Sequence, residues 1–112
     1  MTFNITVERE ARVKNDKTYY TYFINANIRG KEVRISVMPP DTGGYRVLDI
    51  VYGNQNEATL VVTPFEIKDE SGKVIRGNSF SVQSVDEDGE IYECPIKPSR
   101  TSDKSLLNMI LK

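Results

Sequence analysis

The stretch that decides the fold is YYTYFINANIRGKEVRISV, residues 19–37. Its two halves alternate between apolar and polar side chains, and Gly30-Lys31 lies between them. The even positions of residues 20–28 are apolar or aromatic, and so are the odd positions of residues 33–37. Because successive side chains of a strand point to opposite faces of a sheet, this pattern predicts a β-hairpin with one buried face.

The turn residues predict the register of this hairpin. Glycine at the first of two turn positions favours a type II′ turn at Gly30-Lys31, since glycine adopts a positive φ without strain. Such a turn places Ile28 opposite Val33, with the other buried residues also meeting buried partners. A register shifted by one residue would bring the buried set against a solvated one. The pattern therefore predicts which side chains lie inside.

The N-terminal segment extends the same sheet. Residues 2–8 alternate in the same way, and Asn15-Asp16 tolerates the left-handed geometry of a tight turn. Folding at that turn places Val7 opposite Ile24, so both turns predict the same buried face. We expect a three-stranded antiparallel meander formed by residues 2–14, 17–29 and 32–38.

The middle of the chain is less regular. Pro39-Pro40 ends the meander. The segment YRVLDIVYG, residues 45–53, favours a short strand because of its β-branched content, with an amphipathic helix as the alternative. A turn is expected at residues 54–56, and then a strand over residues 57–63 that Pro64 ends.

Two hairpins and a helix are expected in the remainder. The loops 70–72 and 87–89 each end in glycine, which is typical of three-residue turns with a bulge. They pair Ile67 with Ile75, Val82 with Cys94, and Phe80 with Ile96. A short C-terminal helix follows, with Thr101 or Ser102 as N-cap, Asp103 in its first turn, and Leu106, Leu107 and Ile110 on one face.

These elements predict a single β-rich domain over residues 1–112. The expected fold is mostly β, a compact antiparallel β-barrel or sandwich of about seven strands with a short C-terminal helix. The net charge of −1 argues against a strongly basic nucleic-acid binder. The single cysteine, the absence of a visible signal peptide and the lack of a long apolar run favour a cytoplasmic domain with no membrane segment.

The sequence offers little catalytic chemistry. It has no histidine, which removes the commonest general base and the commonest metal ligand. Cys94 lies on the apolar side of its strand and is expected to be a buried structural thiol. The acidic loop at residues 86–90 lacks the spacing of a calcium-binding loop. We therefore expect no enzyme, no catalytic residues, no metal and no cofactor.

The outer face of the meander is the candidate binding surface. Tyr19 and Phe23 lie four residues apart on that face, and aromatic rings of this kind stack on bases for about 1–3 kcal/mol each. Arginine and amide groups around them would engage phosphates and base edges. The candidate nucleic-acid-binding residues are Arg12, Tyr19, Phe23, Asn25, Asn27 and Arg34.

A meander followed by a break and later hairpins is similar in architecture to the five-stranded oligonucleotide-binding (OB) barrel, which binds through strands 2 and 3. That resemblance implies a non-enzymatic domain that binds single-stranded nucleic acid. A structural or protein–protein interaction module, self-associating through an exposed strand edge, is the alternative. A further alternative is that the outer face is ordinary surface, or is covered by the C-terminal helix or a second sheet. A small-molecule carrier would instead need a cavity lined by Tyr20, Tyr22 and Phe80.

Overall fold

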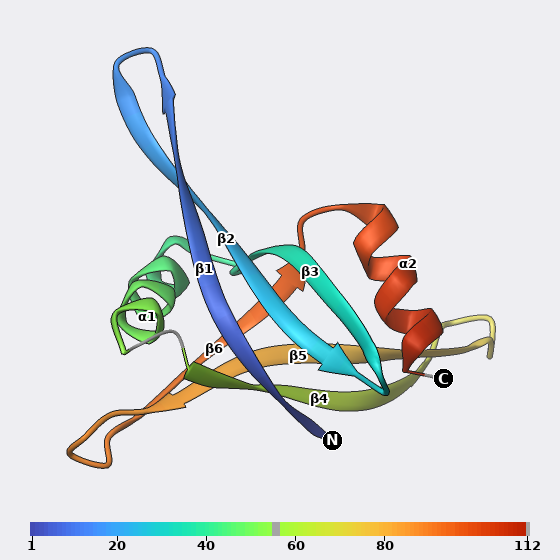
Figure 1. The fold of residues 1–112 in the computed structure, drawn as a ribbon. Helices are drawn as coiled ribbons and strands as arrows, with labels where there is room; N and C mark the ends of the chain where they lie inside the picture. Colours follow the sequence, from blue (N-terminus) through green and yellow to red (C-terminus); the bar gives the residue numbers. More distant parts are fainter. Residues whose placement is uncertain (55–56, 112) are drawn as a thin grey trace.

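The chain folds as one closed antiparallel sheet with two helices. The structure is a computed structural model that describes residues 1–54 and 57–111. Over these residues it contains β1 (Thr2–Lys14), β2 (Lys17–Ile28), β3 (Lys31–Met38), α1 (Thr42–Gly53), β4 (Glu57–Lys68), β5 (Val74–Val85), β6 (Ile91–Pro98) and α2 (Thr101–Ile110). The strands follow the order β1-β2-β3-β6-β5-β4, and β4 pairs back with β1 to close a ring (Figure 1). The mostly β prediction is confirmed, with six strands in the described residues instead of about seven.

The predicted meander is confirmed, and so is the register of its first hairpin. Val7 lies opposite Ile24, and the turn residues Asn15 and Asp16 have φ values of 53° and 62°. Positive φ at both central positions is typical of a type I′ turn, whose twist matches that of the strands. The N-terminal 28 residues therefore fold as local sequence predicts.

The second turn lies one residue earlier than predicted. Arg29 and Gly30 both have positive φ, 52° and 85°, so the turn is again of the type I′ kind. The amide of Gly30 donates to Asn27 Oδ1 at 3.0 Å, which supports this geometry. The predicted pairing is therefore wrong by two residues: Ile24 faces Ile35 instead of Val37. A shift of two preserves the side of every side chain, so the predicted buried set is unaffected.

The core fills the inside of the ring. Ile24 and Ile35 are 1% and 0% exposed, as the alternation predicts. Burial ends before the strands do, because residues 10–20 of the β1–β2 hairpin extend beyond the ring and are exposed (Figure 1). We call residues 10–20 the arm. Tyr20, predicted inside, lies on the correct side of β2 but is 45% exposed because the arm has left the core.

Residues 45–52 belong to helix α1, so the favoured strand prediction is wrong and the helical alternative is correct. The Asp41 side chain caps the helix by accepting a hydrogen bond from the Gly44 amide at 3.1 Å. Leu48 and Val51, three residues apart, are both 0% exposed. An N-cap and an i, i+3 buried pair outweigh the β-branched content. The turn expected at residues 54–56 lies partly outside the described residues.

β4 continues through Pro64, which was expected to end it. Pro64 lies opposite Asn78 in the β4–β5 ladder, and the strand extends to Lys68. β1 pairs with β4 only over residues 57–61, so Pro64 has a neighbouring strand on one side only. A missing N–H donor is tolerated at such a free edge.

The two glycine-ended hairpins are confirmed with their pairing. Gly72 and Gly89 have φ values of 83° and 80°, and Ile67 faces Ile75. An aspartate begins each turn and accepts two backbone hydrogen bonds through Oδ1: Asp69 from residues 71 and 73, and Asp86 from residues 88 and 90, all between 2.8 and 2.9 Å. The β4–β5 and β5–β6 turns are therefore stabilised by the same pair of aspartate-to-backbone hydrogen bonds.

The Asp69 turn predicts a pH effect. Hydrogen bonds from Ser71, and from the Lys73 amide, lower the pKa of the Asp69 carboxyl. A folded-state pKa below the unfolded one contributes stability at neutral pH, and this contribution is lost as the pH falls below about 4. Asp69→Asn should therefore be less stable than the parent at pH 7, and the gap should narrow at about pH 3. Urea unfolding at both pH values measures it, with Glu70→Gln as control. A gap that stays constant with pH would contradict this prediction.

Helix α2 begins at Thr101, and its N-cap is Arg100, which makes no side-chain capping bond. The predicted cap at Thr101 or Ser102 is therefore wrong, whereas Asp103 does lie in the first turn. Leu107 is 1% exposed and Leu106 packs against the core from a partly buried position. The side chain of Ile110 lies outside the described part of the chain. No described helix is long and apolar enough to cross a membrane.

Candidate binding surfaces

The six predicted site residues lie on one face of the meander. In the register, Arg12 lies opposite Tyr19, and Asn25 lies opposite Arg34. Phe23 lies opposite Ser36 instead of Met38, which follows from the corrected second turn. Arg12 and Tyr19 lie on the arm, while the others lie over the ring. The predicted common face is therefore correct, but in the structure the six side chains are divided between the arm and the ring and do not form one cluster.

A hollow of about 960 Å³, lined by polar and apolar side chains alike, lies at the ring end of this face. Three predicted residues, Asn25, Asn27 and Arg34, line it, and Glu32 lies beside them. Ring closure adds residues that the sequence alone did not bring here, because Asn4 pairs with Thr59 and Thr59 with Gln83. The uncharged polar lining is Asn4, Thr6, Asn25, Asn27, Thr59, Gln83 and Ser84. Such a set can donate and accept hydrogen bonds to a polar ligand.

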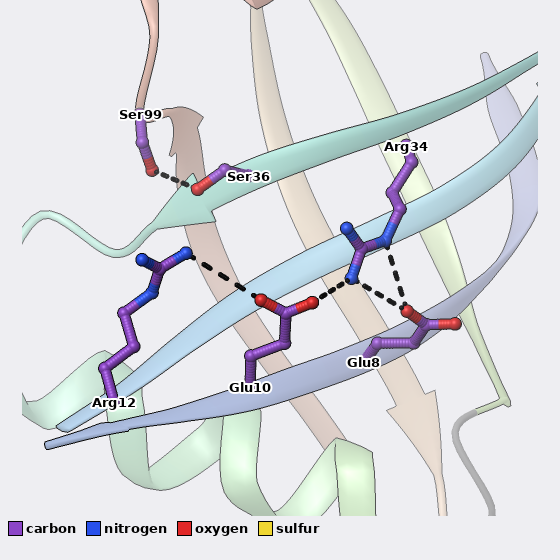
Figure 2. Close-up of polar contacts among 6 residues, drawn as sticks. All are labelled: Glu8, Glu10, Arg12, Arg34, Ser36 and Ser99. Atoms are coloured by element: carbon purple, nitrogen blue, oxygen red, sulfur yellow. Dashed lines mark hydrogen bonds and ion pairs between the residues drawn. The ribbon is translucent and has the colours of Figure 1, made fainter. Parts of the chain in front are cut away.

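The predicted phosphate-binding arginines are held by glutamates of β1 (Figure 2). Arg34 Nη2 lies 2.9 Å from Glu10 Oε1 and 3.2 Å from Glu8 Oε2, and its Nε also donates to Glu8. The hydrogen bond with Glu10 is the main cause that raises the pKa of Arg34. Arg12 Nη2 lies 3.7 Å from Glu10 Oε2. Both positive charges are thus compensated within the sheet.

Arg34 also covers the ring of Phe23. Its guanidinium carbon lies 3.9 Å from the ring centroid, and Phe23 is 6% exposed. Tyr19, in contrast, is 53% exposed on the arm. The two aromatic rings therefore do not form a single open stacking platform in this structure. Nucleic-acid binding by these residues stays a prediction, and it requires Arg34 to leave Phe23.

A second cluster fastens the base of the arm to helix α1. The guanidinium of Arg9 lies between the rings of Tyr20 and Tyr52, 4.4 and 4.6 Å from their centroids. Its Nη1 lies 3.1 Å from Asp49 Oδ1, and the Tyr22 hydroxyl donates to the same oxygen. The pKa of Tyr22 is raised mainly because its hydroxyl is removed from water, and next because of its hydrogen bond with Asp49. Sequence reasoning missed this cluster because it requires residues 45–52 to be helical.

Exposed apolar side chains concentrate on three hairpins that project from the ring, namely the arm, the β4–β5 hairpin and the β5–β6 hairpin (Figure 1). Val13 on the arm is 74% exposed. Phe65 lies opposite Gly77, and its ring covers this glycine so closely that a Cβ added at Gly77 would lie 2.7 Å from the ring. The exposed Ile67–Ile75 pair lies next to it along the same hairpin. The exposed large hydrophobic residues of the hairpins are Val13, Tyr19, Tyr20, Phe65, Ile67, Val74, Ile75, Val85 and Ile91.

The described residues contain no group of three or more metal-binding side chains close enough to hold an ion. Cys94 is 1% exposed, which confirms the prediction of a buried thiol. Burial is the main cause that raises its pKa. Its Sγ packs against Gly44 of α1, so the thiol contributes to packing.

No protein-family model, no curated protein and no solved structure matches this chain.

Proposed function

We propose that this chain is a non-enzymatic protein-interaction domain that contacts its partner through the projecting hairpins. One observation carries this proposal. Of the twelve large hydrophobic side chains that are exposed in the described residues, nine lie on the three hairpins. The outer face over the ring is instead polar and charged.

A two-stranded ribbon is only marginally stable in water by itself, and exposed apolar clusters mark interaction sites. Among the described residues no third strand pairs with residues 10–20, so the backbone edges of the arm are also available for pairing. The Arg9 cluster and α1 fix the base of the arm, which orients it for a partner at little entropic cost.

Photo-crosslinking tests this proposal. A crosslinkable residue is placed at Val13, Ile67 or Ile91, and matched proteins carry it at Glu32 or Thr59 over the ring. In the native cells, we expect specific protein adducts at one or more hairpin positions and not at the controls. Mass spectrometry then identifies the adduct. Absence of adducts at all three hairpin positions, or equal adducts at the controls, would contradict the proposal.

A second candidate function is single-stranded nucleic-acid binding, which the hollow specifically favours. Asn25, Asn27 and Arg34 line it on strands β2 and β3, and a helix separates three strands from the next three. Strands 2 and 3 are also the binding face of the similar OB barrel. In this mechanism a phosphate displaces Glu8 and Glu10 from Arg34 and uncovers Phe23 for stacking.

An oligonucleotide titration tests this second candidate. The anisotropy of a labelled single strand should rise at low salt and less at high salt, because phosphate contacts release counterions. Tyr19→Ala should weaken binding about fivefold or more, since a stacked base contributes about 1–3 kcal/mol. Asn27→Ala should also weaken it, because the hydrogen bonds of the amide are lost. Tyr45→Ala, on α1 and away from this face, is the matched control. No binding at low salt would exclude the candidate.

A further inference from the structure

We infer that the interaction partner is a second copy of this chain, docked head to tail. The tip of the arm of one copy contacts the β5–β6 hairpin of the next. This inference rests on the proposed function, and it names the partner of two of the three hairpins. It is carried by apolar side chains at both tips together with unpaired charges of opposite sign.

The tip of the arm is apolar and basic. Lys14 lies directly opposite Lys17 in the register, and like charges in this position destabilise a sheet. Within the described residues neither lysine forms an ion pair, whereas the nearby Arg12 is held by Glu10. Val13 is next to Lys14 in β1, on the other face of the ribbon, and at 74% it is the most exposed large hydrophobic residue of the described chain. The tip therefore offers an exposed apolar side chain and two lysines without ion pairs, and with the carboxylate of Asp16 in the turn its net charge is +1.

The β5–β6 hairpin is apolar and acidic. Val85 and Ile91 pair across it and are 58% and 61% exposed. The loop between them carries four carboxylates and no lysine or arginine, and none of the four forms an ion pair within the described part of the chain. The Tyr92 hydroxyl lies 3.3 Å from carboxylate oxygens of both Asp86 and Glu90, which shows how closely these charges gather. The four residues are Asp86, Glu87, Asp88 and Glu90.

The two tips match each other between copies and not within one. Figure 1 shows the arm and the β5–β6 hairpin projecting from the ring in different directions, so a single chain cannot bring them together. A two-fold pairing of like tips would set lysine against lysine. Head-to-tail docking instead pairs cations with carboxylates and Val13 with the Val85–Ile91 pair. Such heterologous contacts produce rings or open filaments.

A charge-swap experiment tests the inference. Sedimentation velocity at low salt should show the parent chain increasing in mass with concentration, and less so in high salt. K14E/K17E reverses the charge of the arm tip, and E87K/D88K/E90K reverses the charge of the β5–β6 loop, from −4 to +2. Each set of changes should weaken self-association about tenfold or more. An equimolar mixture should regain it, because each reversed tip then finds a complementary one. K97E/K104E makes the same charge change as K14E/K17E at exposed positions of β6 and α2, away from the three hairpin tips, and it should behave as the parent.

Three results would overturn the inference. The first is a parent chain that remains monomeric at every concentration in low salt. The second is unchanged association of both reversed variants. The third is a mixture that stays monomeric although circular dichroism shows both variants folded. Crosslinks from the hairpins to a different protein, with a monomeric parent, would remove the self-docking inference and leave the proposed function intact.

Discussion

Ile35→Ala should lower the free energy of unfolding by about 2–5 kcal/mol. Ile35 is 0% exposed and lies opposite Ile24, which is 1% exposed, in the β2–β3 ladder. Truncation to alanine removes buried methyl groups and leaves a cavity that a closed ring of strands cannot easily collapse. Because a domain of this size is stable by only about 5–15 kcal/mol, the loss is a large fraction of the total. Urea unfolding followed by circular dichroism measures it.

Ile91→Ala is the matched control, since it changes the same residue type within a strand. Ile91 is 61% exposed on the β5–β6 hairpin, so the monomer should lose less than about 1 kcal/mol. A comparable loss in both variants would mean that the hairpin is buried in the folded chain. That result would remove the basis of the interaction surface as well as the assignment of the core.

Gly44→Ala should destabilise the protein by about 1–3 kcal/mol, although alanine is the better helix former. Gly44 lies in the first turn of α1, where a methyl group would overlap Pro39 and lie 2.9 Å from Cys94 Sγ. All three residues are buried, so relief requires the helix to move away from the sheet. The free energy of unfolding, measured by urea titration, reports the effect.

Gly53→Ala, in the same helix, should instead increase the free energy of unfolding. An added Cβ at Gly53 meets nothing within 4 Å, so only helix propensity acts and the variant should gain up to about 1 kcal/mol. A stabilised Gly44→Ala, similar to Gly53→Ala, would show that α1 does not pack against Cys94 as described.

The features that sequence predicted well are local ones. The side of each strand residue follows from alternation, and Asn15-Asp16, Gly72 and Gly89 mark their turns by chemistry that needs no distant partner. The turn at Arg29-Gly30 was missed because the predicted and observed turns place the same side chains inside. Alternation distinguishes registers that differ by one residue, not by two.

The features that sequence could not supply depend on the closed ring. Helix α1 depends on packing of Gly44 against Cys94, fifty residues away in the sequence. The position where β2 leaves the core, between Tyr20 and Tyr22, depends on the height of the ring. The hollow also exists only because β4 returns to β1 and brings Thr59 to Asn4.

The pairing of β1 with β4 also sets an order of events during folding. The β1–β2 and β2–β3 hairpins close short loops and should form in microseconds, whereas joining Thr2 to Val61 closes a loop of more than half the chain. Until β4 has been synthesised, one edge of β1 has no strand to pair with. Refolding should therefore show a fast phase, in which the hairpins form, and a slower phase, in which β4 pairs with β1. A nascent chain is most prone to mispairing after its hairpins have formed and before β4 has paired with β1.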